Sequence, residues 1–244
     1  MTMDAAERAW KQAAAVLERD PRVNLHRYPL QGRVDRGRLV LSGSVEDIAA
    51  KRIVEALVRR TGDGVEVVSR LRVTPSEHRE DGALRDQVVR NLSDEPALRD
   101  TDLQVRRQDG LQTVRQTGSG ASGLIEVQAE DGTVYLRGHV ASLSHGRLAE
   151  VLAWWAGGCE AVVNTLQVEP PENDDDGELV DAVRLVLERD PLVHADHFTV
   201  RANGGVVRIS GAVRSDEEKR LAVLDVWYVP GVRDVVDAVE VLGP

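Results

Sequence analysis

Cysteine, aromatic residues and long apolar runs are all scarce in this sequence. Its 244 residues include one cysteine, and Phe, Trp and Tyr together make up 3%. A single cysteine excludes an internal disulfide and a cysteine-based zinc site. The cores must therefore be aliphatic, with about 1.5–3 kcal/mol contributed by each fully buried Val, Leu or Ile. A chain of this length can form one large domain or two to three small ones.

The sequence also lacks the features of targeting and membrane-spanning segments. Its first 20 residues contain acids at Asp4 and Glu7, and they have no apolar stretch of the kind that forms a signal peptide. No segment approaches the ~20 apolar residues that cross a bilayer. We therefore expect a cytoplasmic protein without a transmembrane segment, for which peripheral attachment to a membrane surface remains open.

Sequence patterns of catalysis are missing as well. No histidine belongs to a Ser-His-acid set with a recognisable nucleophile turn. The glycine-rich stretch "GSGASG", which ends at Gly123, matches neither a P-loop nor a dinucleotide fingerprint, because no Lys-Ser/Thr follows it and no strand-helix context frames it. We expect no enzymatic activity, no catalytic residue and no cofactor.

The formal net charge of −10 is distributed unevenly along the chain. Residues 1–74 hold 14 basic and 10 acidic side chains (+4), residues 75–170 hold 9 and 15 (−6), and residues 171–244 hold 8 and 16 (−8). A uniformly acidic protein repels nucleic acids and anionic lipids, but one basic third can still present a face to an anion. We expect no nucleic-acid partner.

One nine-residue pattern occurs three times, as "GRLVLSGSV" from Gly37, "GTVYLRGHV" from Gly132 and "GVVRISGAV" from Gly205. Before each copy, apolar residues recur at helical spacing, and an acidic residue followed by proline ends the stretch. The pattern itself lies in the second of two strand-like runs, and a further helix and an apolar strand follow. We therefore predict three tandem α-β-β-α-β units over 1–74, 75–170 and 171–244.

The second helix of each unit has recognisable boundaries. We expect it to begin at Ser44, Ser142 or Ser215, and a glycine closes it. Ser215 and Glu218 form an S-x-x-E capping box, which satisfies amide groups that would otherwise lack partners at a helix start.

The glycine inside each pattern has a predicted structural role. Gly43, Gly138 and Gly211 occupy the same position in the three copies. Glycine within a strand allows a neighbouring backbone or helix to approach closely. We interpret all three as structural, with contact to a ligand as the less favoured alternative.

The pattern "V-x-L-x-G-x-V", a helix and then "P-G-V-x-x-V" resembles the BON domain, named for bacterial osmotically induced and nodulation proteins. The third unit matches best, through Val207, Ile209, Gly211, Val213, Pro230, Gly231, Val232 and Val235. The first unit has "GDGV" in place of Pro-Gly-Val, and the second has "GGCEAV". The resemblance covers nearly the whole chain as three tandem copies.

The resemblance implies an α+β fold in which each unit has a three-stranded mixed sheet with two helices on one face. It also implies a non-enzymatic binding module of the bacterial envelope that attaches to phospholipid surfaces. Because several family members are exported, a periplasmic location is the alternative to a cytoplasmic one.

The second unit contains an insertion at about 104–123. It includes "QDGLQTVRQTGSGASG", whose Gly/Ser-rich end is typical of a flexible loop. We expect the insertion to be disordered, and the alternative is that "LQTVRQT" extends a hairpin.

Two segments contain residue types that bind metal ions, and one cysteine is a candidate reactive thiol. The linker "EPPENDDDGEL" places Val183 where an EF-hand loop starting at Glu172 needs its bidentate Glu, so we interpret it as a solvated linker. His194 and His197 would lie in an extended segment with their rings on opposite faces, and no further ligand is evident. Cys159 aligns with valines in the other units and is expected in the core. We predict no metal site.

Two surface features are candidate binding sites. Arginine forks suit phosphate groups, and we predict an anion- or lipid-binding set around the first hairpin and at the end of the second helix. Aromatic pairs replace the helix-end arginines in the other units. One member of each pair is expected at the edge of the core and the other exposed as an anchor for a lipid interface or a partner protein, and a contact between domains of the chain is the alternative. The predicted sets are Arg33, Arg36, Arg38, Arg59 and Arg60, and Trp154, Trp155, Trp227 and Tyr228.

We therefore predict a non-catalytic protein of three BON modules that attaches to a phospholipid surface or an envelope protein. The hairpin arginines would steer it, and Trp154, Trp155 or Trp227 would insert at the interface. One alternative is a cytoplasmic assembly protein whose basic first unit meets the acidic third unit of another molecule. A second alternative is the binding of a small ligand or ion between modules.

Overall fold

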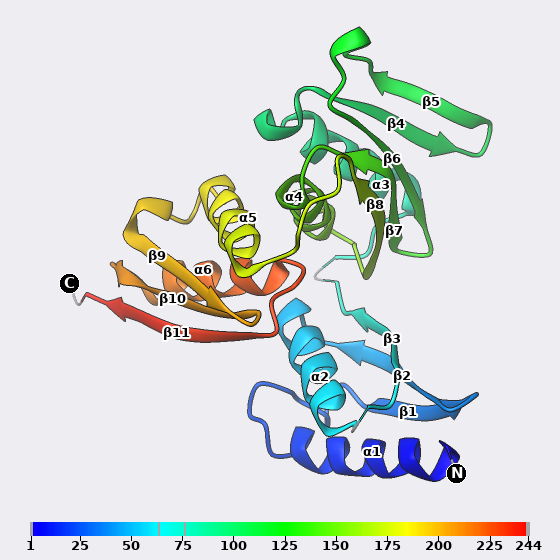
Figure 1. Cartoon of the computed structure of the whole chain (residues 1–244), viewed down its shortest axis with the longest axis vertical. Helices are drawn as coiled ribbons and strands as arrows, with labels where there is room; N and C mark the ends of the chain where they lie inside the picture. Colours follow the sequence, from blue (N-terminus) through cyan, green and yellow to red (C-terminus); the bar gives the residue numbers. More distant parts are fainter. Residues whose placement is uncertain (1, 63, 76, 243–244) are drawn as a thin grey trace. The chain divides into compact units, whose positions relative to one another are not determined.

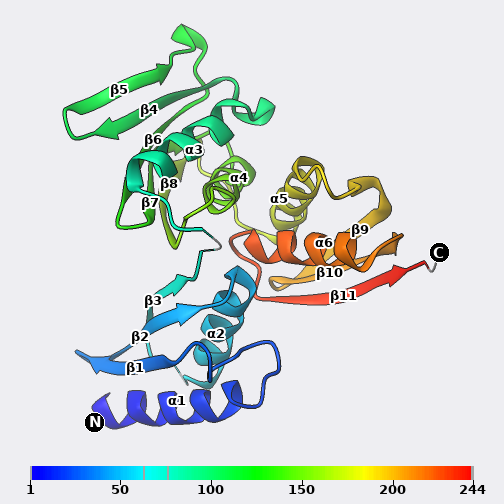
Figure 2. The ribbon, with the colours of Figure 1, turned by 180° about the vertical axis from the view of Figure 1, so that it is seen from behind.

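The computed structural model describes residues 2–62, 64–75 and 77–242. The chain divides into two compact units, which differ from the three predicted repeats. The first unit, Met1–Pro75, corresponds to the first repeat, and the second unit, Ser76–Pro244, holds the second and third repeats. Figures 1 and 2 show each unit as helices packed on mixed sheets. In the described part of the chain, none of the helices combines the length and hydrophobicity that crossing a membrane requires.

The first unit forms a three-stranded sheet with two helices, drawn in blue and cyan in Figure 1. Its sheet has the order β1-β2-β3, in which β2 runs antiparallel to β1 and parallel to β3. The elements are α1 (Thr2–Leu17), β1 (Leu30–Asp35), β2 (Arg38–Val45), α2 (Ile48–Thr61) and β3 (Val67–Val73).

The second unit contains two such groups of helices and strands. The later group repeats the first arrangement, with the order β11-β10-β9 and parallel pairing between β10 and β11. Its elements are α5 (Asp176–Arg189), η3 (Ala195–His197), β9 (Phe198–Asn203), β10 (Val206–Val213), α6 (Asp216–Tyr228) and β11 (Asp234–Val241).

The earlier group of the second unit has a larger sheet than expected, with five strands in the order β5-β4-β6-β7-β8. The added hairpin extends the sheet at one edge, as Figures 1 and 2 both show. The elements are α3 (Asp81–Ser93), η1 (Pro96–Leu98), β4 (Thr101–Arg107), β5 (Gly110–Arg115), η2 (Gly118–Gly120), β6 (Gly123–Glu130), β7 (Thr133–Val140), α4 (Leu143–Trp154) and β8 (Ala161–Val168).

The prediction of a disordered insertion was therefore wrong, and the hairpin alternative is correct. β4 pairs antiparallel with β5 and parallel with β6, so residues 101–115 are fixed by main-chain hydrogen bonds on the sheet. Arg115 secures the end of β5, because its guanidinium donates to the carbonyls of Thr101 and Leu98 at 2.9 and 2.6 Å.

The start of the first unit's second helix also differs from the prediction. Ser44 still belongs to β2, where it pairs with Arg72 of β3. Asp47 is the N-cap of α2, and its carboxylate accepts a hydrogen bond from the Ala50 amide at 2.8 Å. Ser142 and Ser215 cap α4 and α6 as expected.

The cores are aliphatic, as the composition indicates. Among the described residues, the largest fully buried side chains are all leucine or isoleucine, including Leu39 and Leu41 of β2 and Leu136 of β7. These residues alternate along their strands toward the helices, which leaves the opposite face of each sheet uncovered by its own helices.

Candidate functional site

The hairpin between β1 and β2 presents three of the predicted arginines. Arg33 is exposed on β1, and Arg36 lies in the turn with a positive φ of 50°. Arg38 is half-buried at the start of β2, where its guanidinium lies 3.8 Å from the carboxylates of both Asp35 and Glu66. The hairpin is therefore basic, but Arg38 is partly neutralised.

Two further arginines lie on the same face of this sheet. Arg70 and Arg72 flank Leu71, which is 1% exposed and points into the core, so both arginines belong to the opposite face. Arg33 also points away from the helices, because its neighbour Gly32 faces Trp10 of α1. We define the basic face as Arg33, Arg36, Arg38, Arg70 and Arg72.

Sequence reasoning missed Arg70 and Arg72. The apolar pattern predicts only a strand for the last segment of the first unit, "GVEVVSRLRV", although the arginine-leucine-arginine alternation in "RLR" indicates a strand with one basic face. Pairing Ser42 with Arg70, and Ser44 with Arg72, brings both arginines beside β2.

The structure separates Arg59 and Arg60 from the basic face. Both are exposed in the last turn of α2 and therefore belong to the helix layer of the first unit. Arg59 lies 3.8 Å from the Glu55 carboxylate. Cations suit the C-terminal end of a helix, which gives these arginines a local structural role.

The first tryptophan of each aromatic pair is too buried for insertion into a membrane. Trp154 and Trp227 are 7% and 5% exposed, so the prediction that either inserts into a lipid interface is wrong. Both side chains are covered by other residues, and neither is available to a lipid. Trp155 and Tyr228 are half-buried, and an interface role for these two remains a prediction.

The three repeated glycines share one backbone geometry. Gly43, Gly138 and Gly211 have φ values of 130°, 120° and 156°. A Cβ at each position would collide with a carbonyl oxygen of the preceding strand or of the residue just before it, namely that of Pro29, Leu124 and His197 respectively. Both the φ value and the close approach favour glycine.

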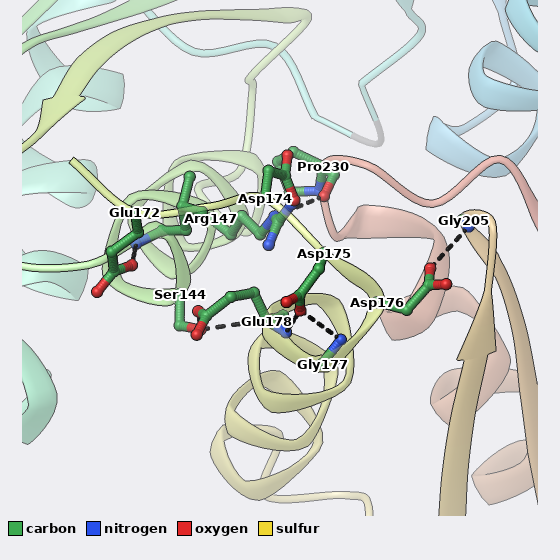
Figure 3. Close-up of polar contacts among 11 residues, drawn as sticks. Ser144, Arg147, Glu172, Asp174, Asp175, Asp176, Gly177, Glu178, Gly205 and Pro230 are labelled. Carbon is green, nitrogen blue, oxygen red and sulfur yellow. Dashed lines mark hydrogen bonds and ion pairs between the residues drawn. The ribbon is translucent and has the colours of Figure 1, made fainter.

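The acidic linker disperses its carboxylates instead of gathering them around one point (Figure 3). Asp175 caps α5 by accepting from the amides of Gly177 and Glu178. Asp176 accepts from the amides of Gly205 and Gly204 in the β9–β10 turn, and these bonds hold its pKa below the ordinary value. This arrangement agrees with a linker and gives no basis for a calcium loop.

Arg147 of α4 joins this linker to two other segments (Figure 3). Its side chain is 8% exposed, and its guanidinium forms an ion pair with Asp174 and donates to the Pro230 carbonyl at 3.0 Å. Close by, Ser144 contacts Glu178 of α5 at 3.2 Å. The contacts of Arg147 tie α4, the linker and the loop before β11 together.

Replacing Arg147 with alanine is expected to destabilise the second unit by about 1–3 kcal/mol, because the Pro230 carbonyl loses its partner and a buried volume empties. Urea denaturation measures this loss. The same replacement of Arg184, whose side chain is 58% exposed on α5, is the control and should change stability by less than about 0.5 kcal/mol. Equal effects of the two replacements would contradict the role of Arg147.

His194 and His197 do not point to opposite faces as predicted. Their rings stack with centroids 5.1 Å apart, and Glu218 of α6 lies beside both. The His194 Nδ1 and Glu218 Oε1 atoms are 2.8 Å apart, and His197 Nδ1 is 3.6 Å from the same oxygen. Burial opposes ionisation of Glu218, but the hydrogen bonds from the side chain and backbone of His194 outweigh it and lower the pKa of Glu218.

Comparison with known families decides what the repeated units are. The family model described as "BON domain" matches residues 8–75, 114–170 and 175–243. The chain belongs to the BON domain family. Its three matches correspond to three tandem BON copies, which confirms the resemblance seen in the sequence.

The middle BON match is shorter than the other two. It begins at residue 114, near the end of β5, and therefore leaves out α3 and β4. β4 is one strand of the added hairpin, whereas α3 holds the place that α1 and α5 have in the other copies, so the strands that follow the insertion, from β6 onward, lie within the match.

Two solved structures are also similar to this BON protein, and a search of curated proteins finds no match. CdsD, a structural protein of the type III secretion system of Chlamydia trachomatis, is 15% identical over 90% of this chain and 89% of that chain, with a TM-score of 0.26. The C-terminal domain of CdsD is 16% identical over 89% of this chain and 93% of that chain, with a TM-score of 0.25. TM-scores this low do not establish a shared overall fold.

Proposed function

We propose that the protein is a non-catalytic binding protein that attaches to an anionic phospholipid surface through the basic face of its first BON copy. Membership of the BON family points to a non-enzymatic role. The observation that supports the lipid partner is the position of Arg33, Arg38, Arg70 and Arg72 on one sheet face that carries no helix of its own unit.

The basic face suits attachment by charge without insertion. Each basic residue close to an anionic membrane contributes about 1 kcal/mol, and added salt weakens the attraction. Asp35 and Glu66 offset part of this charge at Arg38. Because Trp154 and Trp227 are buried, we expect weak, reversible and salt-sensitive binding.

Cosedimentation with vesicles tests this proposal. The full chain should bind vesicles of equal parts phosphatidylglycerol and phosphatidylcholine at low salt, and it should not bind pure phosphatidylcholine. The double variant Arg33→Glu/Arg70→Glu should weaken binding at least about tenfold, because each reversal replaces an attraction of about 1 kcal/mol with a repulsion.

The third BON copy supplies a matched control. Arg201 and Arg208 are cross-strand neighbours on exposed positions of β9 and β10, so Arg201→Glu/Arg208→Glu makes the same charge change on the corresponding sheet. This control should weaken binding much less. Equal losses in both double variants would show a general charge effect, and absence of binding to anionic vesicles at low salt would refute the proposal.

Self-assembly is the second candidate function. The charges of +4 over residues 1–74 and −8 over residues 171–244 favour contact between the first copy of one molecule and the third copy of another. Sedimentation velocity without lipid should then reveal oligomers that dissociate as salt is added. A monomer at every salt concentration would exclude this candidate.

A further inference from the structure

The segment between α5 and β9 brings two histidines to the same side. His194 precedes the single turn η3, and the His197 amide donates to the His194 carbonyl at 2.9 Å. A 3₁₀ turn has three residues per turn, so side chains three apart are eclipsed. This turn therefore places both imidazoles in front of the same end of α6.

A carboxylate from a distant part of the sequence completes the cluster. Glu218 lies in the first turn of α6, and its amide donates to Ser215 as half of the predicted capping box. Its side chain turns to the histidines, where Oε1 also accepts from the His194 amide at 3.2 Å. The carboxylate is therefore oriented before any ligand arrives.

The close packing of His197 on β10 fixes the backbone of this cluster. A Cβ at Gly211 would collide with the His197 carbonyl, so the glycine allows the end of η3 to lie against the strand. The side chains of His194 and His197 are 70% and 44% exposed, whereas that of Glu218 is 10% exposed. Solvent thus reaches both imidazoles beside a buried carboxylate.

We propose that His194, His197 and Glu218 form a binding site for one divalent transition-metal ion of the zinc class. Candidate ligand atoms of the three side chains lie within 4.8 Å of one another. Zinc bonds to nitrogen and oxygen of about 2.0–2.1 Å place tetrahedral ligands roughly 3.3–3.5 Å apart. Rotation of the two exposed imidazole rings would bring the ligand atoms from their present separations to these tetrahedral distances.

The ligand types select the metal. Two imidazoles and one carboxylate suit Zn²⁺, Co²⁺, Ni²⁺ and Cu²⁺, whereas Mg²⁺ and Ca²⁺ prefer oxygen ligands alone. Asp216 and Glu217 add negative charge in the same turn of α6, which offsets the positive end of the helix dipole. Three protein ligands leave further coordination positions for water.

The site belongs to the third BON copy alone. Counting seven residues on from Gly43 and Gly138 gives Ala50 and His145, where the third copy has Glu218 after Gly211. The residue whose carbonyl faces the repeated glycine is Pro29 in the first copy and Leu124 in the second, in place of His197. The same scaffold therefore lacks the full set of ligands in the other two copies.

Calorimetric titration of the full chain with ZnCl₂ tests the site, using chelator-treated protein without a histidine tag. We expect one equivalent of Zn²⁺ to bind with micromolar affinity and to raise the thermal unfolding temperature. His197→Ala and Glu218→Gln should each weaken binding at least tenfold and remove the thermal shift.

Two controls keep the proposal falsifiable. His26→Ala removes an exposed histidine from the first unit and should leave zinc affinity unchanged. CaCl₂ and MgCl₂ should give no comparable heat. The proposal is overturned if His197→Ala binds zinc like the unaltered chain, or if Ca²⁺ binds equally well, since that result would indicate acidic groups alone.

Discussion

Replacing Asp225 with leucine is expected to stabilise the third BON copy at pH 7 by about 3 kcal/mol and to flatten its pH dependence. Asp225 is 3% exposed in α6, and its Oδ2 atom has no hydrogen-bond partner among the described residues. Burial raises the pKa of Asp225 to about 8, and the charge of the neighbouring Asp190 carboxylate and a hydrogen bond between the two side chains act in the same direction. Leu57 and Leu152 hold the equivalent position in the other copies.

The sign of the pH dependence follows from proton uptake on folding. The unfolded chain ionises Asp225 near its ordinary pKa of 3.8, whereas the folded chain keeps the proton up to about pH 8. Between these values, stability falls as pH rises, by about 1.4 kcal/mol per pH unit. The free-energy cost of Asp225 is therefore about 3 kcal/mol larger at pH 7 than at pH 5.

Urea denaturation at pH 5, 6 and 7 measures this effect. The unaltered chain should lose stability relative to Asp225→Leu as pH rises, and the non-titrating Asp225→Asn should also have the flatter profile. Asp181→Asn, at a side chain 66% exposed on α5, is the control and should keep the original profile. Identical pH profiles for Asp225→Leu and the unaltered chain would show that Asp225 is not protonated in the folded state.

Replacing Gly138 with alanine is the second change with a large expected effect. We expect a loss of about 3–5 kcal/mol, because a non-glycine residue at φ 120° is strained and the added Cβ meets the Leu124 carbonyl. Leu124 and Gly138 lie on neighbouring strands β6 and β7 in the middle copy, so relief of the collision would open the pairing of these strands.

Urea unfolding followed by circular dichroism measures this loss. Gly120→Ala is the matched control, because a Cβ at Gly120 would have no atom within 4 Å. The Gly120 variant should unfold near the midpoint of the unaltered chain. If Gly138→Ala unfolds at the same midpoint, the repeated glycine does not have the structural role that the geometry gives it.

The repeated pattern was sufficient to predict the architecture, because backbone conformation and burial within each strand determine its residues. Gly43, Gly138 and Gly211 mark the same strand in each copy, and apolar alternation identifies the buried faces. The β4–β5 hairpin was misjudged because its polar residues and the following Gly/Ser run are typical of a loop. Its stability depends on pairing with β6, which the local sequence does not reveal.

The candidate sites were less accessible to sequence reasoning because they depend on contacts between distant segments. The sequence predicts an extended segment at the histidines, whereas the η3 turn brings them to Glu218, more than 20 positions away. Asp225 looks like an ordinary polar helix residue until α6 is packed against its neighbours. Of the basic face, only the hairpin was predicted, because Arg70 and Arg72 join it through the register of β3.

The strand order β11-β10-β9 makes β11 an outer strand of its sheet, and the charges along it have a consequence for solubility. An outer strand is a template on which a strand of another molecule can add, and this is a common route to aggregation. Asp234, Asp237 and Glu240 recur at every third position, so successive carboxylates alternate between the two faces of β11. Asp237 is paired with Lys219 of α6 at 3.1 Å, but an incoming copy of the same strand would meet like charges at Asp234 and Glu240 on the other face, and this repulsion favours separate molecules in concentrated solution.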